Sequence, residues 1–280
     1  MARPKGSAPS GRSQSSRSQS GRSESGRSQP SRSGDGLGGE HVEGRRAVLE
    51  LLRAGRRQVR TVSMSSSVRD DPVLDEIRER AGSALKVVDP DRIDQMALSD
   101  APQGVVATAA PLRAADLDEL LRSPTAFLVA LDGVSDPRNL GAVARVAETA
   151  GATGLVLPRH RSARITPVVA KAAAGAIEYL PIALVGGIPT ALERAKRAGC
   201  WTIGLDGSAE NRSLFDLELA DQPLVLVMGS EGRGLARLTI ARCEVLVSIP
   251  MRGAIESLNV AAAAALACHE IGRRRAALRS

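Results

Sequence analysis

Short apolar runs alternate with helical segments along the second half of the chain, and this alternation restricts the possible folds more than any other feature. The runs are AFLVAL (126–131), TGLVLP (153–158), YLPIALV (179–185), CWTIGL (200–205), PLVLVM (223–228) and EVLVSIP (244–250). Continuous apolar strands separated by helices are typical of a parallel sheet that is covered on both faces. The pattern predicts an α/β fold with a mainly parallel sheet, whose ligands bind at the carboxyl ends of the strands.

A smaller α/β unit is predicted over residues 40–110, before this sheet. Its apolar periodicity predicts two helices and three strands. The helices are expected at 41–55 and 71–82, and the strands at 59–65, 85–89 and 104–110. Residues 111–125 are expected to be a linker with a short helix, so the domain boundary is placed there and the second domain spans 126–280.

The N-terminal residues 1–39 are predicted to be a disordered Arg/Ser-rich tail. Residues 1–34 hold seven basic residues and one acid, with an arginine every five residues from Arg12 to Arg32, and they leave 31 bases and 30 acids to the rest of the chain. Residues 2–34 contain no large apolar residue and cannot form a core. The tail is suited either to bind RNA phosphates or to act as a solubilising leader without a specific partner.

Several classes of function are disfavoured by composition. The three cysteines and three histidines are scattered, which argues against disulfides, zinc and any other metal site. The few aromatic residues, Phe127, Tyr179, Trp201 and Phe215, are too sparse for a base-stacking platform. There is no secretory signal and no apolar stretch long enough for a membrane span, so a cytoplasmic location is expected.

The loop after the first apolar run leads into a predicted helix. This helix contains an arginine at a position where the neighbouring residues predict burial. Asp136 or Asn139 is suited to cap this helix, and Gly151 is suited to end it. Arg145 lies among small and apolar residues. It either pairs with Glu148, extends to solvent, or serves a functional site.

Two further strand ends carry unusual loops. In VMGSEGRGL, Glu231 lies among glycines that permit close approach of a ligand, although a first-turn residue of a helix would look the same. In IPMRGAIESLNVAAAAALACHE, Ser257 and Asn259 precede an alanine-rich helix, and Ser257 is suited to be its cap. The alanines predict a helix packed closely against another backbone, a ligand or a subunit interface.

Together these loops carry a resemblance to a known family. N-L-G-A-x-x-R, M-G-x-E-G-x-G and I-P-M-x-G-x-x-x-S-L-N-V, in this order, resemble the three motifs of the SpoU (TrmH-like) branch of the SPOUT RNA methyltransferases. The similarity covers residues 126–275, and residues 40–110 more loosely resemble the small substrate-binding domain of members that act on ribosomal RNA.

The resemblance implies a C-terminal trefoil knot, a homodimer, and methyl transfer from S-adenosylmethionine to a ribose 2′-hydroxyl of RNA, with a guanosine of 23S rRNA as the expected target. It assigns catalysis to five positions of this chain: Asn139, Arg145, Glu231, Ser257 and Asn259. It assigns the cofactor to backbone groups around Gly229, Ile249 and Leu258, with Met251 and residues 224–227 nearby.

The chemistry leaves the proton acceptor open. A guanidinium is a weak base, so Arg145 is better suited to grip a phosphate and to stabilise developing alkoxide charge. The proton then goes to water, to Glu231 or to an arginine perturbed by its site. The alternative functions are a resistance-type ribosomal or a transfer-RNA methyltransferase, and an RNA-binding assembly factor without catalysis.

Overall fold

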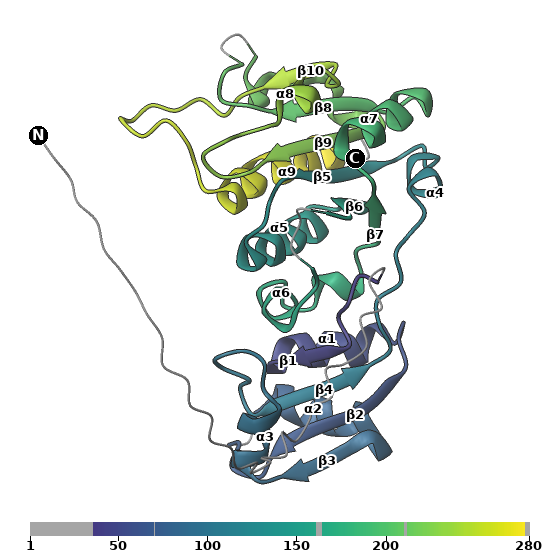
Figure 1. Cartoon of the computed structure of the whole chain (residues 1–280), viewed down its shortest axis with the longest axis vertical. Coiled ribbons are helices and arrows are strands. Elements are labelled where there is room, and N and C mark those ends of the chain that lie inside the picture. The colour runs from purple at the N-terminus through teal and green to yellow at the C-terminus, as the bar shows by residue number, and fades with distance from the viewer. Residues whose placement is uncertain (1–35, 70, 161–163, 210–211, 278–280) are drawn as a thin grey trace, which may run out of the picture. The chain divides into compact units, whose positions relative to one another are not determined.

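The computed structural model describes residues 36–69, 71–160, 164–209 and 212–277 (Figure 1). The predicted tail lies outside these residues except for its last four, where the prediction of disorder is wrong: Leu37 is buried in a hydrophobic core, and Gly38 forms a parallel β-bridge with Ile165. Among the described residues, no helix is long and apolar enough to cross a bilayer.

The first part of the described chain forms a four-stranded sheet in the order β1-β4-β2-β3. Strand β4 pairs antiparallel with β1 and β2, whereas β2 and β3 are parallel. The elements are β1 (His41–Glu43), α1 (Arg45–Ala54), β2 (Val59–Ser65), α2 (Pro72–Ala81), η1 (Gly82–Ala84), β3 (Leu85–Val88), α3 (Pro90–Met96) and β4 (Val105–Ala109).

The predicted helix over 41–55 is wrong at its start, because His41–Glu43 is a strand and the helix begins only at Arg45. Gly44 has φ 94°, a conformation outside the helical region, and it separates the two elements. The side chain of Glu43 is buried and accepts hydrogen bonds from the backbone N–H groups of Leu98 and Ser99. This buried carboxylate fixes the strand in place.

The later residues form a six-stranded sheet in the order β10-β8-β9-β5-β6-β7, and every neighbouring pair among the described strands is parallel. The strands are β5 (Phe127–Asp132), β6 (Gly154–Pro158), β7 (Ile182–Val185), β8 (Trp201–Leu205), β9 (Leu224–Gly229) and β10 (Val245–Val247). The predicted parallel sheet is confirmed. The expected strand over 179–185 is shorter, since Tyr179 follows a 3-10 turn and β7 begins at Ile182.

Helices cover both faces of this sheet (Figure 1). Phe127, Val129 and Leu131 of β5 pack in the core with α5 (Pro137–Thr149), α6 (Pro167–Ala172) and α9 (Val260–Ala277). Leu128 and Ala130 face the opposite core with α4 (Leu117–Leu121), α7 (Ile188–Arg197) and the end of α8 (Arg237–Ile240). The remaining elements are the 3-10 turns η2 (Ala176–Glu178), η3 (Leu214–Asp216) and η4 (Glu218–Asp221).

A buried ion pair joins the segment after α1 to the turn η2. The side chains of Arg57 and Glu178 are only 6% and 2% exposed, and Arg57 Nε donates to Glu178 Oε2 at 2.9 Å. Arg57 Nη1 also donates to the carbonyls of Gly39 and Ala110, each at 2.8 Å. Burial raises the pKa of Glu178 above its ordinary value, and the Arg57 guanidinium opposes that shift. Removing either partner would leave a buried charge unpaired.

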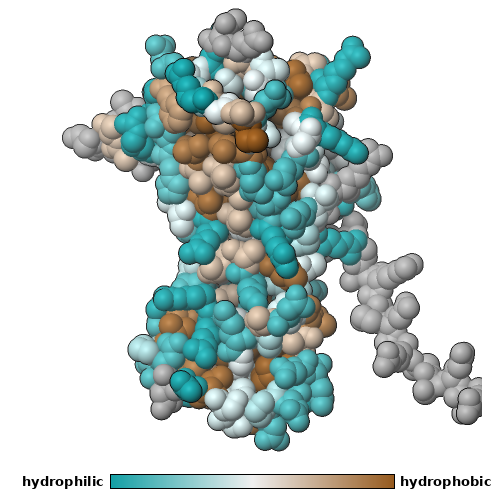
Figure 2. Space-filling model, turned by 90° about the vertical axis from the view of Figure 1, so that its left-hand side faces the viewer, coloured by the Kyte–Doolittle hydropathy of each residue, from teal (hydrophilic) through white to brown (hydrophobic). Residues whose placement is uncertain are grey.

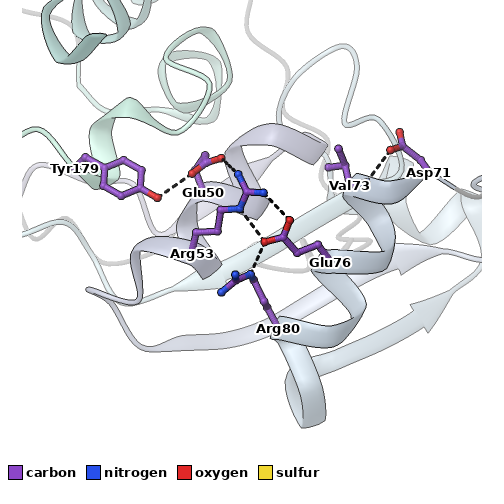
Figure 3. A network of polar contacts seen from close by, with 7 residues as sticks. All are labelled: Glu50, Arg53, Asp71, Val73, Glu76, Arg80 and Tyr179. Carbon is purple, nitrogen blue, oxygen red and sulfur yellow. Dashed lines mark hydrogen bonds and ion pairs between the residues drawn. The ribbon is translucent and has the colours of Figure 1, made fainter. Parts of the chain in front are cut away.

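A second polar network lies beside this pair (Figure 3). The Tyr179 hydroxyl donates to Glu50 Oε2 at 2.8 Å, and Glu50 and Glu76 both accept from Arg53. Arg53 and Arg80 lower the pKa of Glu76 to about 2. Helices α1 and α2 are thereby linked to each other and to the residue that follows η2.

Gly141 allows α5 to pack closely against α6. A Cβ atom at this position would lie 2.6 Å from both the Ala172 Cβ and the Val169 carbonyl oxygen. The backbone oxygen cannot rotate away, so Gly141→Ala should cost about 2–3 kcal/mol, the upper part of the range for overpacking, and regain about 1 kcal/mol of helix propensity. We expect the free energy of unfolding, measured with urea, to fall by about 1–2 kcal/mol.

Gly186→Ala is the matched control, because an added Cβ there meets no atom within 4 Å and the backbone is not left-handed. This variant should be as stable as the parent chain or slightly more stable. Equal stability of the Gly141 and Gly186 variants would contradict the proposed packing constraint.

Candidate active site

Three polar side chains from distant parts of the sequence meet at the carboxyl ends of β5 and β9. Asn139 lies in the first turn of α5, Glu231 follows β9, and Asn259 directly precedes α9. Asn139 Nδ2 donates to Glu231 Oε2 at 3.3 Å, and Asn259 Nδ2 donates to Glu231 Oε1 at 3.0 Å. Asn259 Nδ2 also lies 3.1 Å from Asn139 Oδ1. These contacts close a ring, which we call the amide–carboxylate cluster.

The orientation of the Asn259 amide follows from its position at the start of α9. Its Oδ1 accepts from the backbone N–H of Ala261 at 2.8 Å, which only the oxygen of the amide can do. Its Nδ2 must therefore face the cluster. Asn259 caps the helix in this way, so Ser257, the other residue suited to be the cap, does not cap it: the helix begins at Val260, three residues after Ser257.

A tight glycine loop holds Glu231. Ser230 and Gly234 exchange two backbone hydrogen bonds, at 3.1 and 2.9 Å, so that Glu231 lies in the short loop between them. Gly232 and Gly234 have φ values of 78° and 64°, in the left-handed region that favours glycine. A Cβ at Gly229 would lie 2.1 Å from the Gly234 carbonyl carbon. Glycine at these positions lets the loop fold back onto the end of β9.

A pocket of about 680 Å³ adjoins this loop. Its walls come from the end of β8, the end of β9 and the segment between β10 and α9. Gly229, Ile249, Met251 and Leu258, the four residues expected to bind the cofactor, all line it, as do Glu231 and Ser257. The volume is that of a small-molecule site, and its place beyond the carboxyl ends of parallel strands is where ligands of such sheets bind.

Arg145 lies on a different face of α5 from the cluster. Six residues of an α-helix correspond to about 600° of rotation, so the Asn139 and Arg145 side chains point about 120° apart. Arg145 is exposed, and within the described residues its side chain has neither an ion pair nor a hydrogen bond. Of the three interpretations of Arg145, the pair with Glu148 is thus absent there. Arg138, seven residues earlier, lies on the same exposed face.

Two acids near the site were not singled out from the sequence. Asp132 ends β5 and accepts from the backbone N–H of Ala236 at 3.0 Å, which anchors the segment after the glycine loop. Asp206 directly follows β8 and lines the pocket. Both residues follow apolar runs. Their position at the carboxyl end of a predicted strand is the feature of the sequence that could have identified them.

Comparisons with known proteins identify two regions. The profile of the SpoU rRNA Methylase family matches residues 126–269. The profile named "RNA 2'-O ribose methyltransferase substrate binding" matches residues 41–115.

Full-length relatives extend this match. The chain is 42% identical to "23S rRNA (guanosine-2'-O-)-methyltransferase RlmB" of Ralstonia nicotianae, over 83% of the chain and 94% of the relative. It is 37% identical to the protein of the same name from Pseudomonas putida, over 84% and 97% respectively.

Two solved structures were determined with the cofactor. The SpoU methyltransferase AviRb of Streptomyces viridochromogenes in complex with AdoMet has a TM-score of 0.71 and 27% identity, and covers 84% of this chain and 90% of that one. An AdoMet-bound rRNA methyltransferase of Sinorhizobium meliloti has a TM-score of 0.70 and 25% identity, covering 84% and 87%. Since the family profile spans more than half of the chain and the relatives match nearly end to end, the chain belongs to the SpoU rRNA methylase family.

Proposed function

We propose that this protein transfers a methyl group from S-adenosylmethionine to the 2′-hydroxyl of a ribose in RNA, and that its target is a guanosine of 23S rRNA. The observation that carries the proposal is the pocket at the strand ends, with the amide–carboxylate cluster at its edge. The relatives named for a guanosine of 23S rRNA support the choice of target.

The residues of the pocket fit the cofactor. An added Cβ at Gly207, Gly232 or Gly253 would meet no atom within 4 Å, so these glycines leave room along the pocket lining. Backbone groups around Gly229, Ile249 and Leu258 would hold the cofactor, beside the Met251 side chain. S-adenosylmethionine supplies an electrophilic methyl group on its sulfonium sulfur.

The protein has to orient the ribose hydroxyl. It also has to stabilise the negative charge that develops on the hydroxyl oxygen as the hydroxyl loses its proton. We assign the orientation to Asn139 and Asn259, whose amides Glu231 holds in place. Ser257, exposed beside the pocket, would contact the substrate. Arg145 would grip the neighbouring phosphate with its planar, charged guanidinium and stabilise the developing alkoxide. The proton then passes to water.

The proposed domain layout assigns RNA recognition to residues 40–110, with 111–125 as the linker and 126–280 as the methyltransferase domain. The substrate-binding profile over 41–115 supports it. The unit also carries exposed arginines that form no close ion pair within the described residues, Arg46, Arg56 and Arg60. Such side chains are suited to phosphates.

We further propose a homodimer and a C-terminal knot. Large apolar side chains are exposed at Met251, Ile255, Leu258 and Leu266, and Figure 2 shows an apolar area at the level of the larger sheet. Exposed apolar surface of this kind supports an interface with a second copy. Ser248 exchanges backbone hydrogen bonds with Arg212 and Leu214 before α9 packs against α5. This close passage of the C-terminal segment beside the β8–β9 connection supports the knot.

The experiment that tests the function is a map of 2′-O-methylated riboses, made by mass spectrometry on 23S rRNA from cells with and without the gene. Loss of the mark from one guanosine, restored by the purified protein with S-adenosylmethionine, is the expected result. Unchanged 23S rRNA would overturn the assigned target and direct the search to transfer RNA or a resistance-type site. A protein that binds rRNA but methylates no RNA would instead be an assembly factor.

The tail gives a prediction for RNA binding. Residues 1–34 hold a net charge of six positive units, so they can neutralise up to about six phosphates. Deleting them should make the slope of log K against log salt concentration shallower by up to about four, at about 0.7 per phosphate contact of a single strand. Fluorescence anisotropy with an rRNA fragment measures the slope. An unchanged slope would mean that the tail does not touch RNA, and unchanged cofactor affinity is the control.

A further inference from the structure

Asp206 is a carboxylate in the pocket wall that the proposed chemistry does not use. It directly follows β8 and is half-buried. Its backbone N–H donates to the Val247 carbonyl at 2.9 Å, which continues the pairing of β8 with β10. The residue therefore has a fixed backbone position in the pocket wall.

The two carboxylate oxygens of Asp206 have different surroundings. Oδ1 accepts from the backbone N–H of Ser208 at 2.9 Å and from its hydroxyl at 2.6 Å. Oδ2 faces Gly234, where an added Cβ would lie 3.8 Å away. Within the described residues, Oδ2 has no hydrogen-bond donor and no ion pair. One oxygen is thus held by the loop, and the other has unused acceptor capacity beside a glycine that also lines the pocket.

The position of Asp206 suits one part of the cofactor. In the sheet β8 lies next to β9, and Leu205 is paired in register with Met228. Neighbouring strands are about 4.8 Å apart, so the end of β8 lies roughly that far from the end of β9, where Glu231 and the cluster begin. In S-adenosylmethionine the ribose is joined through its 5′ carbon to the sulfonium sulfur. The distance from the methyl group to the 2′- and 3′-hydroxyls is therefore similar to the spacing between the two strand ends.

We infer that Asp206 Oδ2 accepts hydrogen bonds from the vicinal 2′- and 3′-hydroxyls of the cofactor's ribose. The inference rests on the proposed function, because it takes the pocket to be the cofactor site. A carboxylate is an acceptor only, which matches two hydroxyl donors, and an acid near a strand end has this role in dinucleotide-binding folds. The charged ammonium of the cofactor has other acids available, since Glu231 and Glu256 are exposed at the same pocket.

Isothermal titration calorimetry with two probes tests the inference on the full-length chain. S-adenosylhomocysteine contains both the ribose and the amino-acid group, whereas 5′-methylthioadenosine keeps the ribose and lacks the amino acid. Asp206→Ala should weaken both probes by a similar factor of about 10–100, as expected for lost hydrogen bonds to a charged group. Asp206→Asn keeps one acceptor oxygen, so it should lose less affinity for both probes than Asp206→Ala does.

A third probe, 3′-deoxy-5′-methylthioadenosine, reports on the hydroxyl itself. It should bind the parent chain more weakly than 5′-methylthioadenosine does, and the difference should shrink in Asp206→Ala. Asp216→Asn, which removes an exposed acid in η3 that does not line the pocket, is the matched control and should bind all probes like the parent. Unchanged thermal unfolding without ligand shows that each variant is folded.

The outcomes separate this inference from the proposed function. A loss for S-adenosylhomocysteine alone would assign Asp206 to the ammonium group and overturn the ribose contact. Equal binding by Asp206→Ala and the parent chain would remove Asp206 from the site while leaving the cofactor pocket in place. A parent chain that binds neither probe would overturn the cofactor assignment, and the inference with it.

Discussion

Arg145→Ala is expected to lower the rate of methyl transfer about 10²–10³-fold, the usual effect of removing one group that stabilises charge in a transition state. The affinity for S-adenosylhomocysteine should not change, because Arg145 does not line the pocket and is exposed on α5. Arg145→Lys should recover little, since a lysine lacks the planar fork that binds a phosphate through two hydrogen bonds. Single-turnover transfer of labelled methyl to rRNA, with calorimetry for the cofactor, measures both quantities.

Arg197→Ala is the control for the lost charge, because Arg197 is exposed on α7 and lies outside the pocket. It should methylate RNA at the parent rate. If Arg145→Ala lost cofactor affinity and activity together, Arg145 would be a structural residue and its proposed role at the phosphate would fail.

The position of Arg145 also permits a test of how two copies would share a site. The side chain points about 120° away from Asn139 on α5, so the cluster that we propose it serves belongs either to its own chain or to the second copy of the proposed dimer. Mixing Arg145→Ala chains with Glu231→Gln chains distinguishes these arrangements. Activity appears in the mixture only if one copy supplies the arginine and the other the glutamate to the same site. A mixture that stays inactive would assign both residues to one chain.

The sheet was predictable because each of its strands is a continuous apolar run bounded by polar or glycine residues. The start of α1 was not, since His41–Glu43 looks like part of the helical period that follows. The buried Glu43 and the positive φ of Gly44 decide that segment. Both depend on partners far along the chain, because Glu43 accepts from Leu98 and Ser99 and the Gly44 N–H donates to the Val105 carbonyl. Local periodicity carries no information about such partners.

At the site, the motifs indicated which residues to examine, but not how they are joined. A single backbone donor, the N–H of Ala261, explains why Asn259 both caps α9 and faces Glu231. Ser257 and Asn259 are both good capping residues, so their sequence could not choose between them. Asp206 went unnoticed because one aspartate after an apolar run is unremarkable until β8 is known to lie beside β9.

Glu231→Gln should lower methyl transfer about 100-fold through loss of orientation rather than loss of a base. The Ala261 N–H fixes Nδ2 of Asn259 toward the cluster, where it donates to both Glu231 and Asn139. A glutamine has one acceptor atom and one amino group in place of two oxygens. Whichever way it and Asn139 turn, one amino group faces another, so the ring of hydrogen bonds cannot close.

The dependence of the rate on pH decides between the two roles of Glu231. A positioning role predicts that Glu231→Gln lowers the single-turnover rate by the same factor at every pH, with the shape of the parent profile retained. A general base would instead remove the acid limb of that profile, and the proposal that the proton passes to water would then be wrong. Glu218→Gln is the control, because Glu218 is an exposed carboxylate in η4 that does not line the pocket and makes no contact with the cluster among the described residues. It should keep both the rate and the profile, since removing its charge leaves all three side chains of the ring in place.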